Sequence, residues 1–530
     1  MADLTSEITK RRTFAIISHP DAGKTTLTEK FLLYGGAINL AGSVKGKKTA
    51  KHAVSDWMEI EKQRGISVTS SVLQFNYDGY CINILDTPGH EDFSEDTYRT
   101  LMAADSAVMV IDASNGVEKQ TIKLFKVCVL RHIPIFTFIN KMDREANDPF
   151  ELLDEIENVL GIRTCPMNWP IGSGKEFKGV YDRTDREVSL FTAAMNGQKE
   201  VATERLGIDD AALADELGSH FYEKLQEDIE LLDGASSEFN LDEVRAGDLT
   251  PVFFGSALTN FGVENFLQHF LKMTTAPLAR HSSIGDVDPF SGDFSAFVFK
   301  IQANMNKMHR DRIAFMRICS GKFEAGMEVT HVQGGRKIKL AQPQQMMAQE
   351  RHIVDEAYAG DIIGVFDPGI FSIGDTLTTS NEKFTFDGIP TFAPEHFARV
   401  RQIDTMKRKQ FVKGISQIAQ EGAIQIFQEF NTGMEEIIVG VVGVLQFDVL
   451  KFRLENEYNV DIRLEPLPYE HIRWIENPEE VDVEHLSGTS DMKKIKDLKD
   501  NPLLLFVNSW SVGMVLERNE GLKLSEFGKN

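Results

Sequence analysis

The sequence predicts a multidomain α/β chain: a doubly wound, mostly parallel α/β domain, then a small β-barrel, then an α+β domain. Three observations support this prediction. Short apolar runs alternate with helical patterns over the first half, short strands with glycine-bearing turns follow, and helical periodicity returns after about residue 390. The chain of 530 residues is also too long for one core, because domains average roughly 150 residues.

The doubly wound domain is expected at residues 1–278. Its first strand is predicted at residues 13–17, and a helical pattern begins at Lys24. The later apolar runs, several of them followed by a polar turn and a helical pattern, are residues 82–85, 107–111, 133–139 and 252–254. Ligands of such sheets bind at the carboxyl ends of the strands. The acidic stretch at about 151–248 is expected to be an insertion ahead of the last strand.

The β-barrel is expected at residues 294–388 and the α+β domain at residues 389–530. Apolar residues alternate along two runs of the barrel, at Phe297, Phe299 and Ile301 and at Ala314, Met316 and Ile318. In the last domain, residues 443–458 carry an apolar face, which predicts a helix packed on a core; it consists of Leu445, Val449 and Phe452.

The composition indicates a cytoplasmic protein with reduced thiols. The four cysteines are scattered, without the spacing of a zinc site or a disulfide framework. No apolar run approaches the roughly 20 residues that span a bilayer, and the N-terminus does not resemble a signal peptide. The net charge of −23 excludes a general nucleic-acid coat but permits docking on a nucleoprotein through local basic patches.

A phosphate loop is predicted at Ser18-His19-Pro20-Asp21-Ala22-Gly23-Lys24-Thr25, directly after the first strand. The end of this stretch opens a helix, so backbone N–H groups and the helix N-terminus can hold phosphate. Lys24 is expected to neutralise the β- and γ-phosphates, and the Thr25 hydroxyl to bind Mg²⁺. Ser18 replaces the first glycine of the usual motif. This stretch alone therefore leaves a chance Gly-Lys-Thr at a helix start open.

A second motif, Asp86-Thr87-Pro88-Gly89-His90, follows the strand-like run that ends at residue 85. Asp86 is expected to hold Mg²⁺ through water, and Gly89 to bring its N–H close to the γ-phosphate, where a Cβ would crowd it. His90 is expected to position the attacking water. A partly exposed turn histidine is the alternative for His90.

A switch segment is expected between these motifs, around residues 64–67. Such a segment would close over the γ-phosphate and the metal, and Ser67 is the hydroxyl expected to bind Mg²⁺. A solvated loop is the alternative.

The base is predicted to be guanine, because Asn140-Lys141-Met142-Asp143 follows another strand. The Asp143 carboxylate can accept from guanine N1–H and the 2-amino group, which adenine does not offer. Lys141 is expected along the base plane. Gly255-Ser256-Ala257 follows the last strand and can donate a backbone N–H to guanine O6. Four elements in this order on four strand ends predict a GTPase.

The predicted site has three overlapping sets of residues. The catalytic residues are His90, Lys24 and Gly89. The GTP-binding residues are Ser18, His19, Pro20, Asp21, Ala22, Gly23, Lys24, Thr25, Thr26, Asp86, Thr87, Pro88, Gly89, His90, Asn140, Lys141, Met142, Asp143, Ser256, Ala257 and Leu258. The metal ligands are Thr25, Ser67 and Asp86.

With these motifs the chain resembles the translational GTPases, and within them the class that acts in termination. The matching segments are residues 11–25, 55–59, 62–67, 86–99, 169–172, 321–327, 357–365 and 442–460. The resemblance implies a P-loop GTPase domain, GTP/GDP and Mg²⁺ as cofactors, and hydrolysis activated by the ribosome. It implies removal of the codon-reading (class I) release factors after peptide release. The expected protein is a monomer with no membrane and no DNA partner.

Ser18 and Ser67 depart from wider usage in this family, where glycine and threonine are usual. A serine hydroxyl can still bind Mg²⁺, so the role of Ser67 is kept. Three basic clusters are candidates for contact with ribosomal RNA and proteins, and they are residues 45–51, 307–312 and 407–409. Charge runs are usually solvated surface. Arg310 and Arg312 are expected to contribute to salt-dependent ribosome binding.

Three other functions are consistent with a GTPase domain. A translocase of the elongation factor G type is expected to continue with two more domains. A carrier of the elongation factor Tu type is expected to have a second barrel in place of the α+β domain. A regulatory GTPase subunit of a metabolic enzyme, as in sulfate activation, would hydrolyse GTP without the ribosome.

Overall fold

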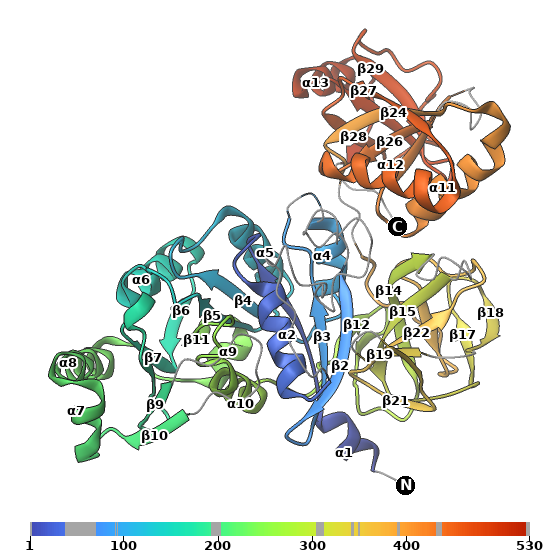
Figure 1. Cartoon of the computed structure of the whole chain (residues 1–530). Coiled ribbons are helices and arrows are strands. Elements are labelled where there is room, and N and C mark those ends of the chain that lie inside the picture. The colour runs from blue at the N-terminus through green and yellow to red at the C-terminus, as the bar shows by residue number, and fades with distance from the viewer. Residues whose placement is uncertain are drawn as a thin grey trace.

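The computed structural model describes residues 3–37, 70–90, 92, 94–191, 203–303, 312–340, 344–347, 350–389, 393–430 and 437–525. Figure 1 shows an α/β domain at the centre, a barrel beside it in yellow, and an α+β domain above them in orange and red. This arrangement confirms the predicted fold class. Within the described ranges, no helix combines the length and apolarity that a membrane crossing requires.

A seven-stranded sheet forms the core of the α/β domain. In sheet order its strands are β2 (Ser71–Tyr77), β3 (Tyr80–Asp86), β1 (Arg11–Ser18), β4 (Ser106–Asp112), β5 (Ile135–Asn140), β11 (Leu249–Phe254) and β6 (Arg163–Pro166). All neighbours are parallel except β2 and β3. Because β1 lies between β3 and β4, the strand order reverses beside β1, which is where such sheets bind ligands.

Helices cover both faces of this sheet. On one face lie α2 (Lys24–Tyr34) and α10 (Val263–Met273), and on the other α4 (Ser94–Leu101), α5 (Lys119–Leu130) and α6 (Pro149–Leu160). Helix α1 (Leu4–Thr9) precedes the sheet. Since β1, β4 and β5 are buried along their whole lengths, they appear in the sequence as continuous apolar runs.

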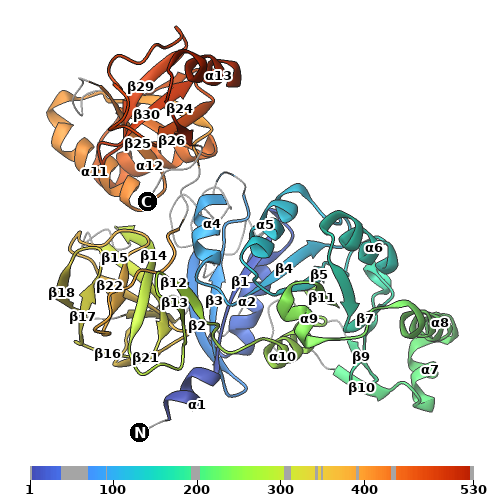
Figure 2. The ribbon, with the colours of Figure 1, turned by 180° about the vertical axis from the view of Figure 1, so that it is seen from behind.

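The insertion forms a small sheet with helices at the edge of the domain, as Figure 2 shows from behind. Its elements are β7 (Asn168–Ile171), η2 (Gly174–Glu176), β8 (Gly179–Asp182), β9 (Glu187–Phe191), β10 (Thr203–Gly207), α7 (Ala211–Leu217) and α8 (Ser219–Ala235), and α9 (Leu241–Ala246) then leads into β11. The separate sheet starts later than residue 151 because β6 still pairs in parallel with β11. Helix α6 and strand β6 therefore belong to the main sheet.

The barrel follows a short hairpin of β12 (Arg280–Ser282) and β13 (Gly285–Val287). Its strands are β14 (Ser295–Ala303), β15 (Arg312–Ser320), β16 (Lys322–Glu324), β17 (Glu328–His331), β18 (Arg336–Lys339), β19 (Gln344–Met347), β20 (Glu350–Ile353), β21 (Glu356–Tyr358), β22 (Ile362–Phe366) and β23 (Thr376–Thr378). Strands β14 and β15 are buried along their whole lengths, because their outer face packs against the core of the α/β domain.

The expected alternation along β14 is broken. Phe297 and Phe299 pack in the core shared with the α/β domain, whereas Ile301 packs inside the barrel. The cause is a register shift between Val298 and Lys300. Such a bulge moves the following side chains to the other face of the strand.

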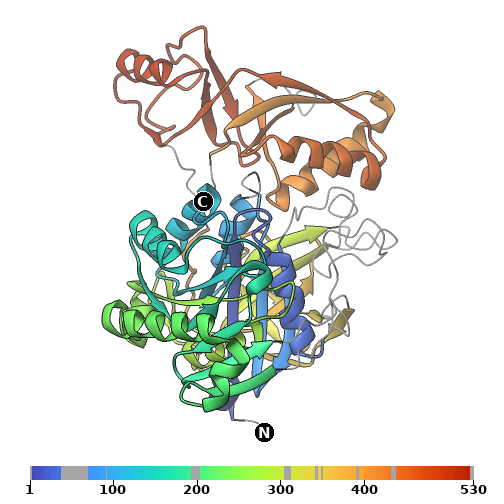
Figure 3. The ribbon, with the colours of Figure 1, turned by 60° about the vertical axis from the view of Figure 1, so that its left-hand side comes forward.

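The last domain is an eight-stranded sheet with helices α11 (Arg408–Gln420), α12 (Leu445–Tyr458) and α13 (Ser509–Arg518). The other elements are β24 (His396–Gln402), η3 (Thr405–Lys407), β25 (Gln425–Glu429), β26 (Ile437–Val441), β27 (Ile462–Leu467), β28 (His471–Ile475), β29 (Met492–Lys496), β30 (Pro502–Phe506) and β31 (Leu524–Ser525). Figure 3 shows α11 and α12 below their sheet, on the side of the other two domains.

Candidate active site

The predicted motifs gather at one edge of the main sheet. The phosphate loop follows β1, Asp86 ends β3, Asn140 ends β5, and Ser256 lies just beyond β11. These strands run in the same direction, so their carboxyl ends meet on one side. The structure therefore brings together segments that are more than a hundred residues apart in the chain.

The phosphate loop approaches the base-reading motif so closely that only glycine fits. Gly23 precedes α2 with a left-handed φ of 100°, a region that favours glycine. A Cβ on Gly23 would also overlap the side-chain amide of Asn140. The following helix begins at Lys24, so its first N–H groups point toward the loop and can hold an anion.

Lys24 and Asp86 form a buried ion pair. Lys24 is 5% exposed and Asp86 is 2% exposed. A buried carboxylate needs a cation close by, and Lys24 meets that need in this structure.

Asn140 joins the phosphate loop to the last loop of the site. Its Nδ2 donates to the Ala22 carbonyl at 2.8 Å, and its Oδ1 accepts from the Ala257 N–H at 2.8 Å. Asn140 is 2% exposed, so both hydrogen bonds are protected from water. Its side chain therefore fixes the spacing between the phosphate loop and the loop that follows β11.

Asp143 and Lys141 each have a partner within the site. The Ser256 hydroxyl donates to Asp143 Oδ1 at 2.5 Å, and Lys141 Nζ lies 2.5 Å from Asp112 Oδ2. Burial disfavours the charged Asp112, but hydrogen bonds from Lys141 and Ser114 outweigh it and lower the pKa of Asp112. Asp112 belongs to none of the predicted motifs, although it ends β4 at the same edge of the sheet.

The Asp86–His90 turn lies directly against the phosphate loop. The Thr87 hydroxyl donates to the Ile16 carbonyl at 2.7 Å, which fixes the turn on β1. A Cβ on Gly89 would lie 3.4 Å from Pro20 Cα. Gly89 therefore has its backbone beside the loop expected to hold phosphate.

His90 lies beside Asp92, a residue outside the predicted set. His90 Nδ1 lies 3.3 Å from Asp92 Oδ1 and 3.4 Å from the Asp92 backbone nitrogen. The His90 side chain is 35% exposed, so part of the ring can still meet a ligand. No sequence signal distinguishes Asp92 from the other acidic residues around it.

Other residues of the predicted site differ in how far they are exposed to a ligand. Met142 and Ala257 are fully buried, and their backbone N–H groups donate to the Gly255 carbonyl and to Asn140 Oδ1. Leu258 is 40% exposed. His19 Nε2 lies 3.4 Å from Glu118 Oε1.

The donor atoms present fit Mg²⁺. Thr25 supplies a hydroxyl at the start of α2, and Asp86 supplies a buried carboxylate that already attracts the Lys24 ammonium. Oxygen ligands of this kind are those that Mg²⁺ prefers. The third predicted ligand, Ser67, lies outside the described residues, as do the switch residues 64–66.

A second group of possible metal ligands joins the insertion to α10. Ligand atoms of Asp182, Asp185 and His269 lie within 4.8 Å of one another. Asp182 Oδ2, however, is 2.7 Å from His269 Nε2 and 2.5 Å from Asn265 Nδ2. The carboxylate is thus already bonded, and these contacts hold the insertion on the main domain.

One expected ribosome contact is wrong. Arg312 is 8% exposed and is bound at Nε by Asp367 Oδ2 at 2.6 Å. It is a buried structural residue and cannot offer its charge to RNA. Residues 45–51 and 307–311 lie outside the described part of the chain. Arg408 and Lys409 of the third cluster are exposed at the start of α11.

Three family models match consecutive parts of the chain. They are the elongation factor Tu GTP binding domain at residues 9–276, elongation factor G domain 2 at residues 293–380, and the C-terminal domain of class II release factor RF3 at residues 386–516. The order of these matches is the order of the three domains in the structure.

Relatives match over the full length. The chain is 60% identical over 522 residues to peptide chain release factor 3 of Symbiobacterium thermophilum, which covers 98% of both chains. It is 53% identical over 525 residues to that of Listeria monocytogenes, covering 99% of each. A crystal structure of a protein from Thermus thermophilus has a similar fold at 20% identity, with a TM-score of 0.69 over 92% of this chain and 72% of that one.

Proposed function

This chain belongs to the peptide chain release factor 3 family of translational GTPases, and from that premise we propose how it works. It binds GTP with Mg²⁺, hydrolyses it when stimulated by the ribosome, and uses the cycle to promote dissociation of class I release factors after peptide release. It acts in the cytoplasm as a monomer. Its partners are ribosomal RNA, ribosomal proteins and the class I factors.

The observation that supports this proposal best is the junction at Asn140. One buried amide holds the phosphate loop and the last loop together, and Gly23 is the residue that allows the approach. A site built in this way can bind phosphate and base at once. Asp143, which the Ser256 hydroxyl already orients, supplies the acceptor that selects guanine.

Each residue then has a defined task. Lys24 leaves Asp86 and neutralises the β- and γ-phosphates, while the Gly89 N–H donates to the γ-phosphate. His90 orients the attacking water in line with the bond that breaks. Mg²⁺, held by Thr25, Asp86 and Ser67, would neutralise charge on the phosphate oxygens.

The alternatives fit less well. A carrier of the elongation factor Tu type would have a second barrel where this chain has α11, α12 and their sheet. The match of residues 386–516 to the release-factor C-terminal domain favours termination over translocation. Nothing in the full-length relatives points to a metabolic regulatory subunit.

The test is GTP hydrolysis by the purified chain with and without ribosomes, together with a labelled class I factor on termination complexes. Strong stimulation with GTP-dependent loss of the label is the expected result. Stimulation without loss of the label would contradict the termination role. Equal hydrolysis with and without ribosomes would contradict both parts of the proposal.

His90→Ala tests the catalytic assignment in the same assay. We expect nucleotide binding to be retained and ribosome-stimulated hydrolysis to fall roughly a hundredfold or more, because the residue orients the reacting water. Binding of fluorescent GDP provides the control. A near-normal rate would remove His90 from the mechanism.

A further inference from the structure

The segment after His90 is docked on the third domain through a helix end. Asp92 Oδ2 accepts the backbone N–H of Leu445 at 2.7 Å. Leu445 is the first residue of α12, and its N-cap residue, Val444, makes no side-chain cap. Asp92 therefore supplies, from another domain, the carboxylate that a helix N-terminus prefers.

The same carboxylate also faces His90. Asp92 Oδ1 lies 3.3 Å from His90 Nδ1, which also accepts the Asp92 backbone N–H at 3.4 Å, while Oδ2 is bound to Leu445. Asp92 itself is 9% exposed. One buried side chain thus connects the expected water-orienting residue to the third domain.

The approach of the two domains at Asp92 depends on Gly443. A Cβ on Gly443 would overlap both the side chain and the backbone Cα of Asp92. The backbone of Gly443 is not in the left-handed region, so an alanine there would not strain its own backbone dihedrals. The absence of a side chain at this position serves the contact with Asp92.

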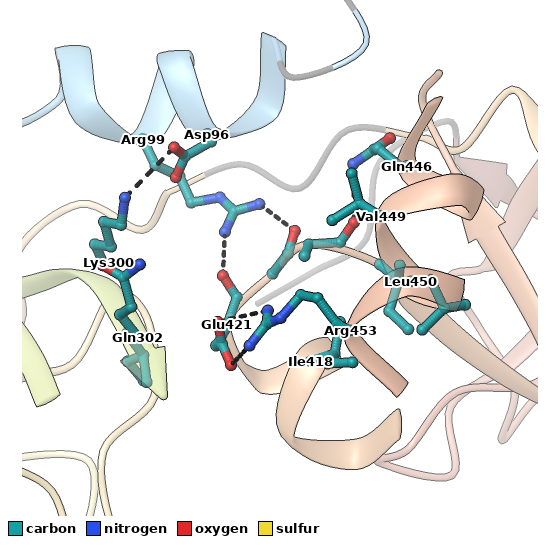
Figure 4. Close-up of a pocket in the computed structure, with 14 residues that line it drawn as sticks. Asp96, Arg99, Lys300, Gln302, Ile418, Glu421, Gln446, Val449, Leu450 and Arg453 are labelled. Atoms are coloured by element: carbon teal, nitrogen blue, oxygen red, sulfur yellow. Dashed lines mark hydrogen bonds and ion pairs between the residues drawn. The ribbon is translucent and has the colours of Figure 1, made fainter. Parts of the chain in front are cut away.

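A second contact lies further along the same segment. The Arg99 guanidinium on α4 donates to the carbonyls of Glu421 and Gly422 at 3.1 and 2.7 Å, as Figure 4 shows. These carbonyls follow the last residue of α11, where a cation is favourable. The segment therefore places an anion at the start of α12 and a cation at the end of α11.

We propose that Asp92 is a positioning residue for GTP hydrolysis. The third domain, through the Leu445 N–H, fixes the Asp92 carboxylate, and this residue restricts the orientation of His90 through that carboxylate and its backbone N–H. A partly exposed histidine on a turn has several rotamers, and restricting them favours the productive one. This inference rests on the proposed role of His90 in hydrolysis.

The experiment uses Gly443→Ala in the full chain, with Gly513→Ala as its matched control. Gly513 lies in α13 of the same domain, and a Cβ there would meet no atom within 4 Å. We expect Gly443→Ala to slow single-turnover hydrolysis at saturating ribosomes roughly three- to tenfold. The affinity for fluorescent GDP should stay unchanged, and Gly513→Ala should behave as the unmodified chain.

Asp92→Ala provides an independent variant, because it removes the same link without adding an atom. Its effect and that of Gly443→Ala should not add, since both break one contact. In a His90→Ala background neither change should slow hydrolysis further. This background separates positioning of His90 from general damage to the third domain.

The inference is overturned if the Gly443→Ala chain hydrolyses GTP at the rate of the Gly513→Ala chain. It is also overturned if adding Gly443→Ala slows the His90→Ala chain by the same factor as it slows the original chain. Either result leaves the proposed function intact as long as the His90→Ala chain hydrolyses GTP slowly. A normal rate for His90→Ala would overturn the histidine assignment and this inference with it. The two failures are therefore distinguishable.

Discussion

At the scale of single residues, the nucleotide site depends on side chains that bind the backbone of distant loops. Asn140 is the clearest case, because its amide donates to Ala22 and accepts from Ala257. An aspartate in its place would lose the donor and leave a buried carbonyl unpaired. Two loops would then be free to separate, although neither would have changed in sequence.

Asp143→Asn is expected to weaken guanine selectivity. The carboxylate accepts from two donors on guanine, whereas an asparagine amide would place a donor against one of them. We expect GTP affinity to fall roughly tenfold to a hundredfold, since an unpaired buried polar group costs about 1–3 kcal/mol. Affinity for xanthosine triphosphate should rise. Competition binding of the two nucleotides measures this change.

The control for that variant is Asp154→Asn, an exposed residue on α6. It removes the same charge away from the site and should leave both affinities unaltered. An unchanged preference for GTP in Asp143→Asn would contradict the base-reading role.

The sequence could predict individual site residues only where the motif itself implies the chemistry. Lys24, Asp86, Asn140 and Asp143 were predicted from spacing and strand ends. The partners Asp112 and Asp92 could not be predicted, because each contacts a residue that only the folded chain brings close to it. Their positions follow from the strand order and from the docking of the third domain.

At the scale of elements, α4 is the place where all three domains meet. Asp96 on this helix lies 3.6 Å from Lys300 Nζ on barrel strand β14. Asp96 also accepts from the Ser70 backbone N–H and hydroxyl, both at 2.6 Å. Figure 4 shows Asp96 turned to the barrel and Arg99 turned to the last domain.

Asp96→Asn is expected to destabilise the chain in a pH-dependent way. Burial opposes ionisation of Asp96, but the charges of Lys300 and Arg99 and the hydrogen bonds from Ser70 outweigh it and lower its pKa. The ionised group therefore stabilises the fold above the ordinary aspartate pKa of about 4. That contribution is lost as the pH falls through the lower folded-state value.

Urea unfolding at a series of pH values measures this effect. The difference in unfolding free energy between the original chain and Asp96→Asn should be largest near neutral pH and should shrink below about pH 4. Asp215→Asn, exposed on α7, serves as the control. A difference that stays constant with pH would contradict the ion-pair account.

The strands of the main sheet could be predicted because they are buried on both faces. Strands β1, β4 and β5 match apolar runs in the sequence to within a few residues. The bulge in β14 could not be predicted, because the residues around Val298 and Lys300 fit either face. Only the packing of the barrel on the α/β domain determines which side chains turn inward.

At the scale of the whole molecule, the order of the domains was predictable but their contacts were not. Asp361 in the barrel accepts from Arg11 Nε at 2.7 Å and from Gln74 Nε2 at 3.2 Å. Arg317 pairs with Asp105 at 2.6 Å. Each pair joins residues more than two hundred positions apart. Such contacts have no local pattern, so the basic run at residues 307–312 predicts a ribosome contact although Arg312 is buried.

Arg312 is buried, so we expect it to stabilise the fold and not to bind the ribosome. Its guanidinium binds Asp367 and donates to the Phe371 carbonyl at 3.1 Å and to Gln420 on α11. Removing one partner of a buried pair costs about 3–5 kcal/mol. We therefore expect Arg312→Ala to lower the thermal unfolding temperature clearly. The salt dependence of ribosome binding should keep its slope, since no phosphate contact is lost.

The matched control is Lys337→Ala, which breaks an exposed pair with Glu328 on the same barrel. Exposed pairs contribute at most about 1 kcal/mol, so its unfolding temperature should hardly change. A flattened salt dependence with unchanged stability in Arg312→Ala would return this arginine to the ribosome-facing surface. The opposite pattern means that the arginine joins barrel strand β15 to the loop at Asp367 and to the end of α11.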